Sequence, residues 1–250
     1  MALPVRKLGL GSQTMTQDNF SAADESRRLV RLSRTAALAT LRGGAPYASL
    51  VTVATDPDGS PILLLSDLAV HSRNLAADVR ASLLYDTHVD GDPLTGTRVT
   101  LSGRLERLSG DAANLDVTRR RFLARQPDAA LYAGFSDFAF YRMALDDAHL
   151  VAGFGRIVDL APSDLLIETA GAEALITEEE SLLETINRDH AQTVAALAGN
   201  PADSGAVWNA IGCDPAGLDL VAGNRTARLD FDTPVLSGDM LLGWLEKRRT

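Results

Sequence analysis

The sequence predicts an α+β protein in which an antiparallel β-barrel of six or seven strands, with flanking helices, is followed by a small α+β unit. Three observations favour this fold. Short apolar runs are joined by tight-turn signals such as Gly43-Gly44 and Asp56–Gly59. Few helical segments separate these runs, whereas parallel strands would need a crossover helix between each pair. The charge pattern changes near residue 161.

The first periodic segment is a helix over residues 21–34, with Ser21 as its N-cap and Asp24 at the acidic third position. From Ala36 the apolar period changes from that of a helix to that of a strand. The predicted strands cover residues 36–42, 46–55, 62–66, 81–85, 97–107, 138–145 and 149–159. Two more helices are predicted over residues 70–78 and 111–125. The Arg119–Arg121 run in the second of them is typical of a solvated helix face.

The segment after residue 160 differs in both pattern and charge. Residues 1–160 carry 18 acidic and 18 basic residues, whereas residues 161–250 carry 15 and 6, which accounts for the net charge of −9. The predicted elements are helices over 178–197 and 237–247, and strands over 207–211, 218–221 and 226–231. We therefore expect a flexible N-terminal arm over residues 1–20, a barrel domain over 21–160 and a small acidic domain over 161–250.

Composition excludes several classes of function. The single cysteine, Cys213, rules out an intramolecular disulfide and a thiolate-rich metal site. Lysine occurs only at Lys7 and Lys247, so a phosphate-binding loop and a pyridoxal phosphate Schiff base lack the internal lysine that they need. No apolar run reaches the roughly 18 residues of a membrane span. We expect a cytoplasmic protein without nucleic-acid or membrane partners, because the acidic chain has no basic stripe.

The most informative stretch runs from Ser66 to Asn74, where a predicted strand ends and a short helix begins. Free backbone N–H groups and the helix dipole favour an anion at such a position. Ser72 offers a hydroxyl there, and the guanidinium of Arg73 matches a phosphate. The same residues could equally provide a helix cap and a surface arginine.

At this point the chain resembles a known family, the pyridoxamine 5′-phosphate oxidase-like FMN-binding split barrels. The segments Pro46–Val51, Pro61–Asp67 and His71–Asn74 resemble the flavin-binding core, and Thr97–Gly103 resembles the strand that follows. The resemblance covers about residues 25–160. The Gly-Phe-Gly-Arg sequence within 149–157, with the appended C-terminal domain, is similar to the haem-iron utilisation (HugZ-type) branch.

This resemblance implies an FMN-binding oxidoreductase that acts on an unidentified small substrate and forms a homodimer with the cofactor near the interface. The catalytic residues cannot be assigned from the sequence. The resemblance places Ser49, Leu50 and Val51 at the flavin ring, and the turn residues around the phosphate. The full set of cofactor-binding candidates is Ser49, Leu50, Val51, Ser66, His71, Ser72, Arg73, Asn74, Arg98 and Arg156.

Two alternatives stay open. One is a haem-binding or haem-degrading protein of iron utilisation, with His149 or His190 as the iron ligand and Arg156 near the propionates or the iron. No histidine lies near the C-terminus, where that branch carries its axial ligand. The other is a non-catalytic binding protein whose barrel holds neither cofactor tightly.

Overall fold

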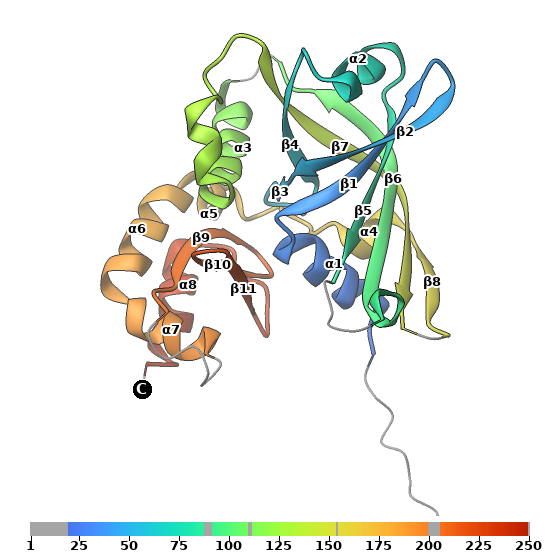
Figure 1. Cartoon of the computed structure of the whole chain (residues 1–250). Helices are drawn as coiled ribbons and strands as arrows, with labels where there is room; N and C mark the ends of the chain where they lie inside the picture. The colour runs from blue at the N-terminus through green and yellow to red at the C-terminus, as the bar shows by residue number, and fades with distance from the viewer. Residues whose placement is uncertain (1–19, 88–91, 110–111, 154, 200–205, 250) are drawn as a thin grey trace, which may run out of the picture.

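The protein is described by a computed structural model that covers residues 20–87, 92–109, 112–153, 155–199 and 206–249. Its main feature is a curled antiparallel sheet with the strand order β2-β1-β5-β6-β7-β4-β3, to which β8 adds by pairing with β7 (Figure 1). The strands are β1 (Thr35–Arg42), β2 (Ala45–Thr52), β3 (Ala54–Thr55), β4 (Pro61–Ser66), β5 (Arg80–Asp86), β6 (Thr97–Arg107), β7 (Phe138–Ala152) and β8 (Ile157–Leu160). This confirms the predicted α+β class with an antiparallel split barrel. The expected N-terminal arm lies outside the described residues, apart from Phe20.

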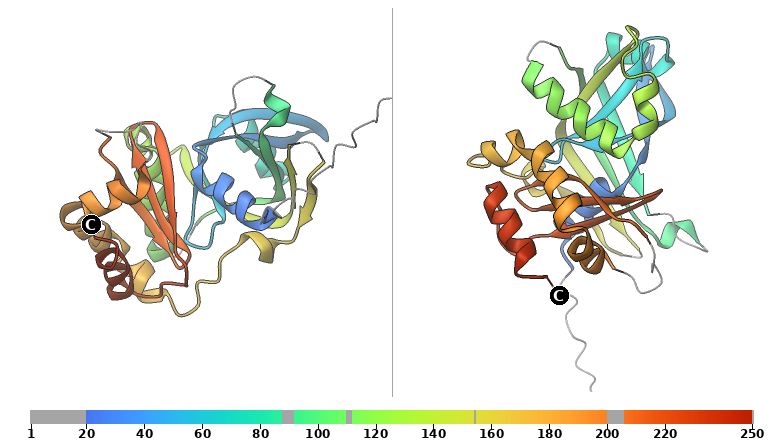
Figure 2. Two further views of the ribbon diagram at one scale, coloured as in Figure 1. Left: turned by 90° about the horizontal axis from the view of Figure 1, so that it is seen from below. Right: turned by 90° about the vertical axis from the view of Figure 1, so that its left-hand side faces the viewer.

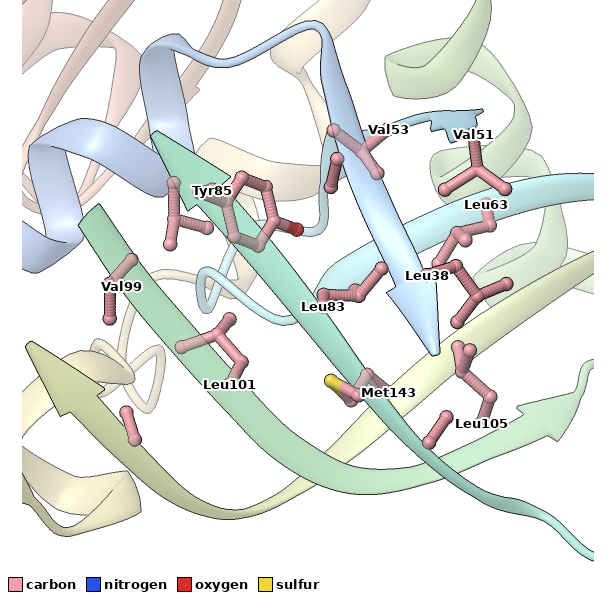
Figure 3. Packing of buried hydrophobic residues seen from close by; sticks show 14 of the residues in the cluster. Leu38, Val51, Val53, Leu63, Leu83, Tyr85, Val99, Leu101, Leu105 and Met143 are labelled. Atoms are coloured by element: carbon pink, nitrogen blue, oxygen red, sulfur yellow. The ribbon is translucent and has the colours of Figure 1, made fainter. Parts of the chain in front are cut away.

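The curl encloses the main hydrophobic core. Side chains alternate along each strand, so one face of the sheet points inward and is buried. Leu38, Leu83, Leu101 and Met143 meet inside the curl from four different strands (Figure 3). Buried residues thus recur at every second position of these strands, which is the pattern that predicted them.

Three helices complete this part. Helix α1 (Ala22–Leu32) packs Leu29 and Val30 into the main core, and Ser21 caps it as predicted. Helix α2 (Val70–Ala77) lies against β1 and β2. Helix α3 (Ala112–Arg125) covers the outer side of β4 and β7, where Phe122 packs edge-on against Phe140 with ring centroids 5.7 Å apart.

Two of the predicted strand boundaries were wrong. Strand β7 is continuous from Phe138 to Ala152, although two strands were predicted there. It runs through the acidic pair before Ala148 because the β6–β7 register shifts between Ser102 and Gly103. A Cβ at Gly103 would lie 2.2 Å from the carbonyl oxygen of Ala144, so this irregularity requires glycine. The predicted strand over 46–55 is also divided, into β2 and β3.

The elements after residue 160 build a second unit with its own core. They are α4 (Pro162–Leu165), α5 (Glu173–Thr177), α6 (Glu179–Asp189), α7 (Ala191–Ala198), β9 (Asn209–Asp214), β10 (Gly217–Ala222), β11 (Arg225–Asp230) and α8 (Gly238–Glu246). Two short 3₁₀ helices, Pro127–Leu131 and Pro93–Thr95, lie in the first unit. Helices α6 and α8 lie on the side of the three-stranded sheet that faces away from the barrel (Figure 2).

The prediction of a single helix over residues 178–197 was wrong. The chain leaves helical geometry at His190, with φ −121° and ψ 11°, and starts again as α7. The backbone N–H of His190 ends α6 by donating to the Ile186 carbonyl, and its own carbonyl accepts the N–H of Val194. The break turns the imidazole of His190 into the protein, where it is 8% exposed.

Side chains protect one edge of the small sheet. The amide of Asn187 makes two hydrogen bonds to the backbone of Ala210 in β9, of 3.0 and 2.7 Å. The Cys213 N–H donates to a Glu179 carboxylate oxygen (2.7 Å), and the Cys213 carbonyl accepts from Arg121 (3.0 Å). These contacts occupy strand-edge groups that would otherwise be free to pair with another chain.

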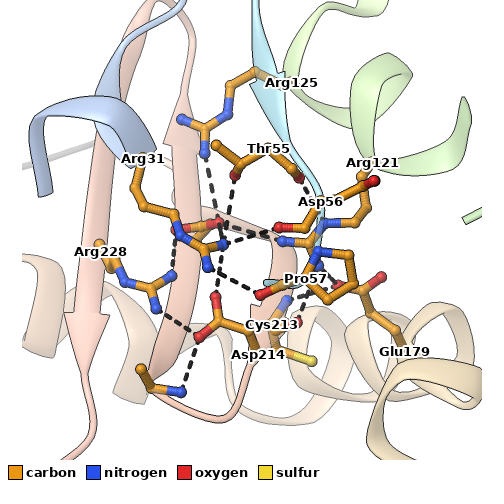
Figure 4. Close-up of polar contacts among 12 residues, drawn as sticks. Arg31, Thr55, Asp56, Pro57, Arg121, Arg125, Glu179, Cys213, Asp214 and Arg228 are labelled. Carbon is orange, nitrogen blue, oxygen red and sulfur yellow. Dashed lines mark hydrogen bonds and ion pairs between the residues drawn. The ribbon is translucent and has the colours of Figure 1, made fainter. Parts of the chain in front are cut away.

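A buried network of charges joins the two units (Figure 4). Asp214 lies 2.8 Å from Arg31 Nη1 and 2.7 Å from Arg228 Nη2, while Arg228 Nη1 lies 2.8 Å from Asp219. Each side chain of the network is at most 4% exposed. We call these residues the clasp: Arg31 of α1, Arg121 and Arg125 of α3, Glu179 of α6, Asp214 of β9, Asp219 of β10 and Arg228 of β11.

The interpretation of the Arg119–Arg121 run as a solvated helix face was wrong for Arg121, which belongs to the clasp. Arg121 is buried, because it reaches Glu179 and Asp219 in the second unit. Gly212 leaves the space that it needs, since a Cβ there would lie 3.2 Å from its guanidinium. Burial alone would raise the pKa of Asp219, but the surrounding guanidinium groups, with Arg228 first, lower it to about 2.

Replacing Asp219 with alanine should destabilise the protein by about 3–5 kcal/mol, because buried guanidinium groups would lose their carboxylate. Urea unfolding followed by circular dichroism measures this. The matched control is Asp232→Ala, which removes a 76% exposed carboxylate paired with Arg248 and should cost less than about 1 kcal/mol. Equal effects of the two substitutions would show that the clasp does not contribute to stability as described.

Candidate functional site

The stretch from Ser66 to Asn74 forms a strand-to-helix turn, as predicted. Strand β4 ends at Ser66, and α2 begins at Val70. The hydroxyl of Ser66 donates to Asp137 (2.9 Å) and accepts the N–H of Leu68 (3.1 Å). This hydroxyl therefore holds the turn against the start of β7.

Helix α2 is anchored to the sheet by two polar contacts. The Nδ1 atom of His71 lies 3.1 Å from the Ser49 hydroxyl of β2. The amide of Asn74 donates to the buried Thr40 hydroxyl of β1, at 2.9 Å. Burial lowers the pKa of His71, which favours the neutral imidazole.

The N-terminus of α2 has no side-chain cap and no acidic residue in its first turn. The Ser72 hydroxyl is buried and has no hydrogen-bond partner among the described residues. Arg73 is exposed and donates to the Leu68 carbonyl at 2.6 Å. An uncapped helix N-terminus beside an unpaired hydroxyl and an exposed guanidinium is chemically suited to an anion. We call Ser49, His71, Ser72, Arg73 and Asn74 the α2 site.

The other two ring candidates lie on opposite faces of β2. Val51 is 6% exposed and belongs to the main core, whereas Leu50 is 76% exposed on the outer face. Strand pairing places Leu50 in one row of directly opposed residues across six strands. We call this the outer row: Leu50, Ala37, Leu84, Thr100, His149 and Asp159.

The outer row ends in a histidine–carboxylate pair. Nδ1 of His149 lies 2.6 Å from Oδ1 of Asp159 across the β7–β8 hairpin. The His149 side chain is 47% exposed. With Nδ1 donating to the carboxylate, the lone pair of Nε2 is left for another partner, which is the arrangement that metal-binding histidines use.

The remaining candidates lie elsewhere. Arg98 is on the outer face of β6, two residues before Thr100, and donates to the carbonyls of Leu94 (3.0 Å) and Gly96 (3.4 Å). Arg156 lies over the Phe20 ring, 4.6 Å from its centroid. His190 is buried in the second unit, between α6 and α7, where its Nδ1 has no partner among the described atoms.

Sequence reasoning did not single out Asp159 or Thr40. Asp159 was assigned to the same predicted strand as His149, which hid their pairing across a hairpin. The signal for the hairpin was present in Gly153 and Gly155, which adopt φ values of 62° and 88° that favour glycine. Thr40 gave no signal, because its partner Asn74 is 34 residues away.

The curled antiparallel sheet with its flanking helices defines an antiparallel split-barrel protein. The family model for the CREG β-barrel matches residues 17–165, and the chain belongs to this family. Among the described residues, no helix has the length and apolar character needed to cross a membrane.

Comparison with individual proteins gives three informative matches. The chain is 31% identical over 160 residues to the chloroplastic non-canonical heme oxygenase HOZ of Arabidopsis thaliana, over 63% of this chain and 48% of that protein. It therefore spans about half the length of this curated relative. Solved structures resemble it over most of its length. One, of a protein of unknown function from Agrobacterium tumefaciens, has 30% identity, coverage of 95% of this chain and 100% of that one, and a TM-score of 0.79.

The third match is a heme-binding protein from Mycobacterium smegmatis. It is 31% identical, the alignment covers 92% of this chain and 97% of that chain, and the TM-score is 0.56. The split-barrel family to which the chain belongs thus includes haem-related members.

Proposed function

We propose that the protein binds haem on the outer face of its main sheet, with His149 as the ligand of the iron. The observation that carries this proposal is the His149–Asp159 pair, which leaves Nε2 available on an exposed face. The names of the Arabidopsis and Mycobacterium relatives support the choice of haem. His190 is the weaker candidate, because it is buried among the helices of the second unit.

The surroundings of His149 fit a flat apolar ring with acidic groups at its edge. Leu84 and Ile157 are 40% and 64% exposed on the same face, and neither is covered by another described element. Arg98 lies on this face as a cation for a propionate, and it donates at present to two carbonyl oxygens of the preceding turn. Bound haem would supply redox chemistry at iron, while Asp159 would hold the imidazole in the tautomer that binds the metal.

We also propose that two copies pair through the face that carries the outer row. Besides Leu50 and Leu84, this face presents small uncharged residues on β1 and β2, among them Ala37, Ala39 and Ala48. An exposed and largely uncharged surface on β1 and β2 favours association with a matching surface. A ligand at His149 would then lie at the edge of the dimer interface.

FMN is the second candidate ligand, and the α2 site favours it. The unpaired Ser72 hydroxyl beside the uncapped helix N-terminus fits a phosphate oxygen. Arg73 would add a charge-assisted hydrogen bond. The flavin would supply electron-transfer chemistry, and the acceptor or donor substrate is left open. Ser49 and His71 would support the site through their mutual contact.

Replacing His149 with alanine should remove the iron-linked Soret shift seen on adding hemin and weaken hemin binding at least about 10-fold, because the metal loses its ligand. Absorption titration measures this. His71→Ala is the matched control, since His71 lies on the α2 site, and it should retain the shift. An unchanged spectrum for His149→Ala, or no hemin binding by the wild type, would contradict the assignment.

Replacing Leu50 with aspartate should convert the proposed dimer into monomers, because it places a charge on the apolar surface of β2 that the second copy would cover. Size-exclusion chromatography with light scattering measures the mass. The control is Leu131→Asp, at a leucine that is 80% exposed away from this face. A monomeric wild type would refute the dimer, as would dissociation by the control alone.

Replacing Ser72 with alanine should weaken FMN binding about 10- to 100-fold, the effect of about 1.5–3 kcal/mol for a hydrogen bond to a charged group. Quenching of FMN fluorescence measures the affinity. Ser181→Ala, at an exposed serine of α6, is the control and should bind as the wild type does. Equal affinities of all three proteins, or no quenching, would exclude FMN from the α2 site.

A further inference from the structure

A third candidate binding place lies between the two units, away from His149 and from the α2 site. It is a cleft of about 780 Å³ bounded by α1, by the connection after α4, by the β9–β10 turn and by the end of β11 with the segment that follows it. This volume is within the range of cavities that hold cofactor-sized ligands. The cleft is lined by Asp24, Glu25, Arg27, Arg28, Arg31, Leu166, Ile167, Glu168, Ala170, Pro215, Ala216, Arg228, Asp230, Phe231, Pro234 and Leu236.

One wall of the cleft is apolar and rigid. Phe231 packs edge-on against Trp244 with ring centroids 4.9 Å apart, which fixes the aromatic ring beside the cleft. Leu236 lines the same side and is 38% exposed, so its side chain is accessible to a ligand. Ile167 is held in place by a backbone hydrogen bond to the Asp58 carbonyl of 2.8 Å. This wall suits a flat apolar body.

The opposite wall presents two neighbouring arginines of α1. Arg27 pairs with Asp24, and Arg28 lies 3.4 Å from Asp230. Both carboxylates are highly exposed, at 69% and 63%, so these pairs contribute little stability. A ligand with two carboxylates can replace them, because each guanidinium keeps a charged partner of the same kind.

Two buried arginines, both paired with carboxylates, also line the cleft. They are Arg31 and Arg228, and both belong to the clasp. The residues that line the cleft carry balanced charge, with four arginines and the four carboxylates Asp24, Glu25, Glu168 and Asp230. The carboxylates of a ligand would therefore be received at Arg27 and Arg28 in exchange for Asp24 and Asp230. No histidine, cysteine, methionine or tyrosine is among the described residues that line the cleft, so it offers no ligand to a haem iron.

We propose that this cleft binds a flat, apolar dicarboxylate without a metal, with its carboxylates on Arg27 and Arg28 and its body against Phe231 and Leu236. The class of ligand follows from the cleft alone. The choice of a metal-free tetrapyrrole within that class rests on the proposed haem function, because such a molecule is what remains when haem loses its iron.

Protoporphyrin IX is the probe, and its fluorescence on titration with the protein gives the affinity. We expect micromolar binding by the wild type and a loss of about 10- to 100-fold in the double variant Arg27→Ala/Arg28→Ala. Leu236→Asp, which changes the apolar wall at an exposed position, should weaken binding about 10-fold. Arg80→Ala is the control, since Arg80 is 71% exposed, pairs with Asp78 and does not line the cleft. Binding that is absent, or equal in all four proteins, would overturn the proposal.

His149→Ala separates this proposal from the haem site. It should lose the iron-linked Soret shift with hemin and keep wild-type affinity for protoporphyrin IX. If protoporphyrin IX binding falls with His149→Ala and not with the arginine variant, the probe binds at the outer row and the cleft proposal is wrong. If hemin gives no shift while protoporphyrin IX binding depends on the arginines, the proposed haem site fails and the cleft site stands.

Discussion

The buried pairing of arginines with carboxylates in the clasp is the constraint on which the arrangement of this protein depends. Its members come from α1, α3, α6 and the three strands of the small sheet, and each is nearly inaccessible to water. A buried charge without a partner costs far more than an exposed one, so these elements have to assemble together. The second unit therefore sits against α1 and α3 in one position, and that position creates the cleft beside Arg27 and Arg28.

Local pattern was sufficient to predict most of the barrel. In β1 buried and exposed residues alternate from Thr35 to Thr40, which is the signal that the sequence displays. Strand β7 was divided in the prediction because its acidic pair looks like an interruption. The continuation depends on Gly103 of the neighbouring strand, which no local window includes. The clasp was missed for the same reason, because Arg121 and Glu179 are 58 residues apart.

The candidate sites were predictable in part. The anion-binding character of the turn before α2 followed from the residues themselves, and the structure adds that the Ser72 hydroxyl has no described partner. Without the strand register, the sequence could not show which of these residues share a face of the sheet. Ser49 and Val51 share the inner face of β2, while Leu50 points outward with the outer row. The register thus separates these candidates onto the two faces of one strand.

The choice of arginine in the clasp has a regulatory consequence. A guanidinium holds its charge when buried and bridges two carboxylates at once, as Arg228 does with Asp214 and Asp219. A buried lysine in the same place would lose its proton more readily and offer a single nitrogen. Because lysine occurs only at positions 7 and 247, acetylation and other amine-directed modifications cannot reach the junction between the two units. Lysine acetylation, which removes a positive charge, therefore cannot alter the charge of this junction.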